Sequence, residues 1–402
     1  MQTSFTLAQL ADPDIAEADK ILRACVHCGF CTATCPTYVL LGDELDSPRG
    51  RIYLIKDMLE HDRPATVEVV KHIDRCLSCL ACMTTCPSGV HYMHLVDHAR
   101  AHVEQTYRRP WADRVLRALL ATVLPYPARF RAALRAGAVG RLFAPLFDAI
   151  GLTPIAAMLR LVPTRLPADG VQAPRVFAAQ GIRKARVALL QGCAQQVLAP
   201  SINAAAIRLL TRLGVEVVLA EGEGCCGSLV HHMGREQQAL AQARINIDAW
   251  TREAETDGLD AILVTASGCG TTVKDYGFML REDKAYAKNA ARISALAQDI
   301  SEFLAAFAAD FAALRRDFFG LTVAYQSACS LQHGQKITKQ PRTYWHNAGL
   351  RCATCRKATS AAARPAPTTS CSPKSRADCA TERSRTSPER ARMSSRPETS
   401  AA

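Results

Sequence analysis

Two cysteine runs of the same design carry the strongest chemical signal in the 402-residue chain. Eight of its 17 cysteines form them, and both runs follow the spacing C-x2-C-x2-C-x3-C-P. The thiolates of such a run hold cubane iron–sulfur clusters, and the fourth cysteine of each run ligates the neighbouring cluster. The spacing therefore predicts two [4Fe-4S] clusters with crossed ligands. Cluster 1 is assigned Cys25, Cys28, Cys31 and Cys86, and cluster 2 is assigned Cys76, Cys79, Cys82 and Cys35.

Structural zinc and disulfides are the competing uses of cysteines at such spacing. Zinc knuckles take one CxxC pair each rather than three cysteines and then Cys-Pro. Disulfides do not suit a reduced cytosol. The N-terminal 20 residues lack the basic region and apolar core of a secretory signal, and no apolar run reaches the roughly 18 residues of a membrane span. We therefore expect a cytoplasmic protein in a reducing compartment, which favours iron–sulfur clusters.

A second group of cysteines follows the strands of an alternating strand–helix pattern. Buried strands are expected at 184–191, 215–219 and 261–265, with a helix at 202–213 after the first and a long helix after the second. This alternation predicts a parallel sheet, whose carboxyl edge binds ligands. Cys193, the pair Cys225 and Cys226, and Cys269 all come directly after a strand. They are a candidate metal or redox-active set, in addition to the two clusters.

Glycines beside each of these cysteines let the backbone turn tightly and present the thiols together. Helices that begin at these turns would lower thiol pKa values. The competing interpretation is that each cysteine is a small buried residue. His231 and His232 follow closely and could add a ligand or a donor, or they could be surface residues. No residue in the chain is assigned a catalytic role.

The elements that must position these groups divide the chain into five segments, and the fold class is α+β multidomain. Residues 1–100 are predicted to form a mainly helical two-cluster domain of the ferredoxin type, in which 40 residues separate Cys35 from Cys76. A helix should begin at Ser47-Pro48. Residues 179–290 are predicted to form an α/β cysteine-rich repeat, and 291–349 to begin a second copy after a helical linker at about 290–317. The second copy has a strand at 321–325 that leads to Cys329, with His333 beyond it.

Residues 101–178 form a connector with arginines among aliphatic residues, including an amphipathic helix that begins near Trp111 and ends near Pro125. Two interpretations remain open. The connector could lie against anionic lipid or a partner subunit, or it could be a helix packed on the protein's own core with a solvated arginine face.

Residues 350–402 contain Ser, Thr, Arg, Ala and Pro with almost no aliphatics, a composition typical of a disordered tail. DNA encoding residues 355–372 can spell PEGHLCCGSAGTYNILQ when it is read one base over, which would supply the missing CCG of the second repeat. We therefore predict a frameshift near 343–350. Residues 351–402 also carry 11 Lys/Arg against four acids, so most of the formal charge of +12 belongs to this tail. It does not indicate nucleic-acid binding, and no nucleic-acid partner is expected.

The chain resembles the iron–sulfur subunit of bacterial glycolate oxidase across about residues 1–345. The motifs that carry the resemblance are ACVHCGFCTATCPTY, DSPRGRIYLIKDMLE, CLSCLACMTTCPSGVHY, LLQGCAQ, EGEGCCGSL, TASGCG and SACSLQHGQKI. The resemblance implies an electron-transfer subunit of a hetero-oligomeric oxidoreductase complex. It would accept electrons from FAD-binding subunits that oxidise glycolate to glyoxylate and pass them towards the membrane quinone pool at the inner face of the cytoplasmic membrane.

Two departures and two alternatives accompany the resemblance. The fullest form of the cysteine-rich repeat ends in CxxC, whereas this chain has Ser267-Gly268-Cys269, and its second repeat lacks CCG. An additional iron–sulfur centre would thus be one thiolate short. The alternatives are a subunit of a related 2-hydroxyacid (lactate) dehydrogenase complex and a heterodisulfide-reductase-like thiol redox protein.

Overall fold

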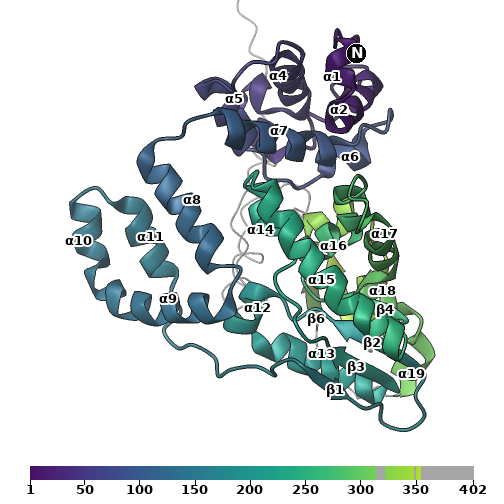
Figure 1. The fold of residues 1–402 in the computed structure, drawn as a ribbon. Coiled ribbons are helices and arrows are strands. Elements are labelled where there is room, and N and C mark those ends of the chain that lie inside the picture. Colours follow the sequence, from purple (N-terminus) through teal and green to yellow (C-terminus); the bar gives the residue numbers. More distant parts are fainter. Residues whose placement is uncertain (314–321, 348–349, 355–402) are drawn as a thin grey trace, which may run out of the picture.

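The structure is a computed structural model that describes residues 1–313, 322–347 and 350–354. Figure 1 shows a helical domain at the N-terminal end, a sheet domain beneath it, and a helical arm that extends to one side. Within the described residues, no helix has both the length and the apolar character needed to cross a membrane.

The N-terminal domain is built from helices alone, as its sequence predicts. Its elements are α1 Leu7–Leu10, α2 Pro13–Ala24, α3 Pro36–Leu41, η1 Glu44–Asp46, α4 Pro48–Glu60, α5 Val67–Asp74, α6 Ala81–Thr85 and α7 Tyr92–Thr106. Leu22, Ile55, Ile73 and Leu95 on α2, α4, α5 and α7 are fully buried in one core. This core holds the two cysteine loops between its helices.

Helix α4 begins at the predicted residues. The Ser47 hydroxyl accepts a hydrogen bond from the Gly50 backbone at 2.9 Å, and Pro48 occupies the first turn. A Cβ atom at Gly50 would lie 2.1 Å from the Glu44 carbonyl oxygen, so only glycine allows η1 to lie this close to α4. The DSPRGR motif therefore fixes how η1 and α4 meet.

The arm, residues 111–161, contains α8 Trp111–Val123, α9 Pro127–Gly140, η2 Arg141–Phe143, α10 Ala144–Ala149 and α11 Thr153–Leu161. Helix α8 ends just before Pro125, as predicted. Ala121 of α8 is buried against Val230 and Met233 of the sheet domain. Phe130 of α9 packs in a cluster with Val197. Helices α8 and α9 therefore attach the arm, whereas α10 and α11 extend away from the sheet (Figure 1).

The sheet domain has five strands in the order β1-β3-β2-β4-β5. The strands are β1 Arg175–Phe177, β2 Ala185–Leu189, β3 Val215–Leu219, β4 Ala261–Val264 and β5 Ala297–Asp299. The inner strands pair in parallel, as predicted, but β1 is antiparallel to β3, so the sheet is mixed. Strand β5 lies in the segment predicted to be a helical linker; it is only three residues long and carries no alternating pattern.

Helices cover both faces of this sheet. They are α12 Cys193–Leu198, α13 Pro200–Arg212, α14 Ser228–His232, α15 Glu236–Thr256, α16 Ser267–Met279, α17 Ala287–Leu296, α18 Ile300–Ala305 and α19 Ala308–Ala313. Helices α13 and α18 share one core with the sheet, and α15, α16 and α17 share another. The long helix expected after Cys226 is divided into α14 and α15. Gly234 lies between them at φ +78°, where a Cβ would meet the Arg100 carbonyl at 2.2 Å.

The second repeat is represented by β6 Thr322–Tyr325, η3 Ser330–Gly334, α20 Gln340–Asn347 and β7 Arg351–Thr354. Strand β6 lies where the sequence predicts it and pairs in parallel with β7. The first residues of the predicted tail therefore form a strand, because residues 351–354 complete a two-stranded sheet. The remainder of that prediction, residues 355–402, lies outside the described residues.

Candidate iron–sulfur and thiol sites

The two cysteine loops of the N-terminal domain share an unusual backbone conformation. His27 and Ser78 occupy the same position of the two runs and have φ +59° and +48°. Two residues later, Gly29 and Leu80 have φ +83° and +60°. Left-handed non-glycine residues are costly and gather at functional sites. The internal repeat is therefore visible in the backbone, which turns the thiols of each run towards one point.

Each loop borders a small cavity together with the distant cysteine of the other run. One cavity is lined by Cys25, Cys28, Cys31 and Cys86. The other is lined by Cys35, Cys76, Cys79 and Cys82, and Cys82 also reaches the first. These are the crossed sets predicted from the spacing, and four thiols around one enclosed space suit a cubane cluster. Their role as ligands stays a prediction.

Burial raises the pKa values of several of these thiols, so they stay protonated at neutral pH when no metal is bound. It raises the pKa of Cys31 to about 11, with a further contribution from the neighbouring Cys25. Burial likewise raises the pKa of Cys79 to about 11 and that of Cys82 well above its ordinary value. Because metals bind thiolates, iron binding and deprotonation must occur together in these cavities.

A buried arginine lies beside the cluster 2 cavity, and the sequence analysis did not identify it. The Arg51 side chain is 1% exposed. Its Nη1 donates to Cys35 Sγ at 3.8 Å, its Nη2 donates to Thr37 Oγ1 at 3.0 Å, and its Nε donates to the His72 carbonyl at 2.7 Å. Arg51 is the last arginine of DSPRGR. The sequence analysis used this motif only as evidence of the family resemblance and assigned it no role.

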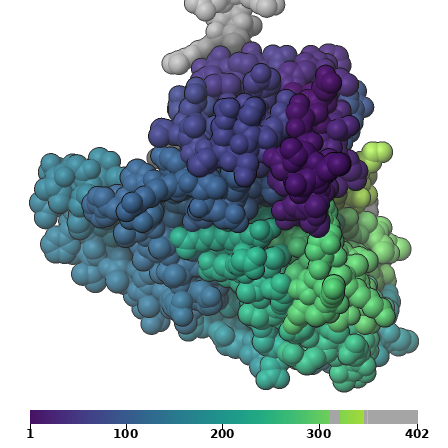
Figure 2. Space-filling model, turned by 45° about the horizontal axis from the view of Figure 1, so that its top comes forward, coloured from purple at the N-terminus to yellow at the C-terminus, as the bar shows by residue number. Residues whose placement is uncertain are grey.

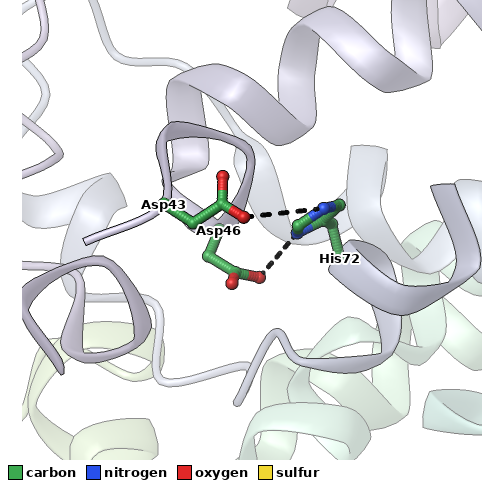
Figure 3. Close-up of side chains that lie close together, drawn as sticks. All are labelled: Asp43, Asp46 and His72. Carbon is green, nitrogen blue, oxygen red and sulfur yellow. Dashed lines mark hydrogen bonds and ion pairs between the residues drawn. The ribbon is translucent and has the colours of Figure 1, made fainter. Parts of the chain in front are cut away.

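Asp43, Asp46 and His72 lie close enough together to resemble a metal site (Figure 3). His72 Nδ1 is 2.9 Å from Asp46 Oδ1, and its Nε2 is 4.0 Å from Asp43 Oδ2. However, Arg51 also contacts Asp46 Oδ1 at 3.4 Å, and Arg75 contacts Oδ2 at 2.7 Å. A metal cation would face two guanidinium groups, so we interpret the cluster as the anchor that holds Arg51 in place.

The four thiols of the sheet domain meet at the carboxyl edge of the sheet, as predicted. Cys193 begins α12 after β2, Cys225 and Cys226 follow β3, and Cys269 lies in the first turn of α16 after β4. The Sγ atoms of Cys193 and Cys225 are 3.5 Å apart. Cys225 and Cys226 are buried. Four cysteines at one sheet edge suit a cluster or a redox-active set of thiols, although among the described residues no three of these sulfurs lie close enough together to hold one metal ion.

These thiols control one another's protonation. The hydrogen bond between Cys225 and Cys193 lowers the pKa of Cys225 and raises that of Cys193. Hydrogen bonding to Cys226 lowers the pKa of Cys269, and hydrogen bonding to Cys225 and then to Cys269 raises the pKa of Cys226. The neighbouring thiol, rather than a helix N-terminus, is the main cause of both lowered values. Cys225 and Cys269 are therefore the two thiols of the set that ionise more readily than their neighbours.

Residues absent from the sequence analysis fix the turn that carries the adjacent cysteines. Asn246 Nδ2 donates to the Cys225 carbonyl at 2.9 Å, and Tyr276 Oη donates to the Cys226 carbonyl at 2.8 Å. Glu223 accepts from the Gln191 backbone at 3.1 Å, and burial raises its pKa to about 8. Asn246 and Tyr276 belong to helices whose local patterns show only helix, so no short motif could have identified them.

His231 and His232 are directed away from the thiols. On α14 they face Asp97 of α7, with nitrogen–oxygen distances of 3.4 and 3.3 Å. Burial opposes the ionisation of Asp97, but the two histidines outweigh it and hold the pKa of Asp97 well below its ordinary value. The suggested role of the histidines as ligands is therefore replaced by a contact between the two domains.

Cys329 lies between the two domains rather than with the thiols at the sheet edge. Its charge contributes to the raised pKa of Cys79 in the cluster 2 loop. Thr84 Oγ1 and His333 Nδ1 are 2.7 Å apart, and Ser330 Oγ donates to Ser267 Oγ at 2.8 Å. The start of the second repeat thus connects cluster 2 with the helix that carries Cys269.

Comparison with known proteins agrees with this arrangement. Residues 21–90 match the family described as 4Fe-4S dicluster domain, and residues 187–274 match the family described as Cysteine-rich domain. The glycolate oxidase iron-sulfur subunit of Escherichia coli is 48% identical over 84% of this chain and 78% of its own length. The chain belongs to the glycolate oxidase iron–sulfur subunit family.

Other relatives are more distant. A probable glycolate oxidase iron-sulfur subunit of Bacillus subtilis is 30% identical over 80% of the chain and 73% of its own length. Lactate utilization protein A of Bacillus licheniformis is 24% identical over 30% of the chain and 48% of its own length. No solved structure matches the chain. The family assignment therefore favours the glycolate type over the lactate alternative.

Proposed function

We propose that this chain is the electron-transfer subunit of a glycolate-oxidising complex. It accepts electrons from an FAD-binding subunit that converts glycolate to glyoxylate and passes them towards a membrane quinone. The observation that carries the proposal is the pair of cavities, each lined by cysteines drawn from both runs. When bound, each cluster would carry one electron at a time. The protein residues hold the clusters, bury them and set their electrostatic surroundings.

Exposure and contacts suggest an order for the two clusters. Cys28 is exposed, and it is flanked by the exposed apolar residues Val26 and Phe30. Cluster 1 would therefore be the one that a partner subunit can approach. Cluster 2 lies towards the sheet domain, because Leu80 and Thr84 contact the segment after Cys329. Electrons would pass between the outside and the sheet-edge thiols through both clusters.

The crossed ligation is tested by pairs of variants in anaerobically purified protein. We expect Cys28→Ala and Cys86→Ala each to remove cluster 1, so that both variants show the same remaining spectrum, that of cluster 2. The spectra are measured by electron paramagnetic resonance after partial reduction. Cys35→Ala and Cys79→Ala should share the other spectrum. Cys329→Ala is the control that keeps both clusters, with about eight irons per chain. Uncrossed ligation would instead pair Cys28 with Cys35, and bound zinc would contradict the proposal altogether.

A second candidate function is thiol redox chemistry at the sheet edge. The 3.5 Å separation of Cys193 and Cys225 and the lowered pKa of Cys225 favour it. It predicts a paramagnetic signal on oxidation that Cys225→Ala abolishes while both N-terminal clusters persist. If Cys225→Ala leaves every signal unchanged and the chain still transfers electrons, these thiols are structural.

A further inference from the structure

The arm carries a large share of the exposed apolar surface. Of the 27 large apolar side chains that are exposed in the described chain, 13 belong to residues 111–161. Leu142 and Leu161 are 80% and 82% exposed. Monomeric soluble proteins rarely expose large contiguous apolar patches without a binding role. Figure 2 shows the arm projecting from the body of the molecule, so its outer side is not covered by the rest of the described chain.

The exposed apolar side chains come from every element of the arm. They are Trp111, Val115, Leu119, Tyr126, Val139, Leu142, Phe143, Leu146, Ile150, Leu152, Ile155, Met158 and Leu161. Helices α10 and α11 contribute Leu146, Ile155, Met158 and Leu161, and they pack mainly on each other and on η2 and α9. The apolar side chains of these two helices are therefore only partly covered by the rest of the described chain.

The arm also carries a concentrated positive charge. It contains seven arginines and two aspartates, a net of +5, while the rest of residues 1–350 is neutral in formal net charge. Asp148 pairs with Arg160, and Asp113 pairs with Arg109. Arg114, Arg135 and Arg141 are exposed and form no ion pair with any described acidic side chain. The arm thus offers uncompensated guanidinium groups beside apolar side chains.

We propose that the arm binds the surface of a membrane that contains anionic lipid. Exposed Trp, Leu and Phe side chains can enter the boundary of the acyl chains, and arginines beside them can pair with lipid phosphates. A second copy of the arm would bring like charges together. The chain's own residues 351–402 carry a net of +7 and would be repelled as well. An acidic lipid surface satisfies both the charge and the apolar side chains.

The test uses the full chain with its clusters, sedimented with vesicles of phosphatidylcholine alone or mixed with phosphatidylglycerol. We expect binding to the mixed vesicles that weakens with salt, and much weaker binding to the neutral ones. The variant Leu142→Glu/Leu161→Glu should abolish binding. In the variant Arg135→Gln/Arg141→Gln, each lost charge should lower the partition coefficient by about fivefold.

Matched controls lie outside the arm. Ile182→Glu changes a side chain that is 88% exposed, and Arg208→Gln/Arg212→Gln removes two exposed arginines of α13; both variants should bind like the unaltered chain. Equal loss of binding in these controls would overturn the proposal. So would a protein with intact cluster spectra that binds no vesicle. A dimer that Leu142→Glu dissociates, or capture of the arm by the flavoprotein subunit instead of vesicles, would assign the surface to a protein partner.

Cluster content and reduction by the flavoprotein subunit in solution are measured in the same samples. These readouts depend on the clusters and not on the arm. Loss of vesicle binding with both readouts intact would therefore concern the arm alone. Absence of clusters would instead count against the proposed electron-transfer function.

Discussion

At the scale of single residues, Arg51 places a positive charge beside the cavity predicted to hold cluster 2. Its guanidinium group is buried, donates to Cys35 Sγ, and is balanced by Asp46. Hydrogen bonds to cluster sulfurs and nearby charge are the main ways in which proteins tune cluster potentials. The equivalent space at cluster 1 holds Arg49, which is partly exposed and paired with Glu44 at 2.7 Å. The two clusters therefore have different electrostatic surroundings.

Replacing Arg51 should shift the potential of one cluster. In Arg51→Gln the lost positive charge disfavours the reduced, more negative state, so the midpoint potential of cluster 2 should move to lower values. The fold should also lose roughly 3 kcal/mol, because buried Asp46 loses one of its partners. Redox titration followed by electron paramagnetic resonance measures the potentials of both clusters.

Two controls separate charge from structure. Arg51→Lys keeps the charge and should restore most of the potential. Lys56→Gln lies on the same helix and breaks only the pair with Glu60, so it should change neither cluster. Equal shifts of both clusters in Arg51→Gln would show that the effect is general loosening of the domain rather than local charge.

At the scale of elements, α7 and α14 form a contact between the N-terminal and sheet domains. Asp97 of α7 is buried, bonds to Arg100 at 3.2 Å, and faces both histidines of α14. Burial lowers the pKa of His231, but the hydrogen bond and charge of Asp97 outweigh it, so the pKa is raised above its ordinary 6.5. This contact holds α7 of the N-terminal domain against α14 of the sheet domain.

The contact should depend on pH in a defined direction. A raised histidine pKa gives stability that is fully present below about pH 6.5 and lost as the pH rises through the raised value. The depressed pKa of Asp97 gives stability that is present above its ordinary 3.8 and lost only as the pH falls through its lower value. Hydrogen exchange of α14, corrected for its intrinsic rate, should show less protection above the histidine pKa than below it.

Asp97→Asn should remove most of this dependence and destabilise the contact by about 3 kcal/mol, because Arg100 and His231 lose the buried carboxylate that they contact. Asp19→Asn, which breaks a surface pair with Arg23 on α2, is the matched control and should leave α14 unchanged. Protection of α14 that falls with pH equally in the Asp97→Asn variant and in the unaltered chain would contradict this account.

At the scale of the whole molecule, the second cysteine-rich repeat is the incomplete part. The first repeat supplies four thiols at one sheet edge, whereas the described part of the second repeat has Cys329 between β6 and η3 and Cys352 within β7. The thiols of the two repeats therefore cannot form matching sets within the described chain. The proposed frameshift near residues 343–350 would account for this asymmetry.

Sequencing the DNA around codons 343–350 tests that proposal. We expect that restoring one base replaces residues 355–372 by PEGHLCCGSAGTYNILQ, the missing CCG segment of the second repeat. A chain with this restored sequence should gain thiols near Cys329 and a further redox signal. An unbroken reading frame in independent isolates, with the present residues 355–402 retained, would show that the tail is a genuine part of the protein.

The sequence by itself determined that two cluster sites lie in the N-terminal region, from the cysteine spacing, and that this region is helical, from its lack of alternating apolar residues; the crossed ligand sets stay a prediction. Spacing is sufficient there because ligands within one run are local, and the proline after the fourth cysteine sets where the chain departs. The strands at 215–219 and 261–264 were equally clear, since buried strands read as continuous apolar runs.

Only the tertiary structure decided which groups surround those sulfurs. Arg51 reaches Cys35 from a separate helix, Asn246 and Tyr276 hold the adjacent cysteines from other helices, and His231 is directed to Asp97 instead of the thiols. The antiparallel β1 and the three-residue β5 also went unpredicted, because short edge strands are defined by their partners. Contacts between residues far apart in sequence depend on how the faces of helices and sheets pack against one another. Local periodicity in the sequence does not predict that packing.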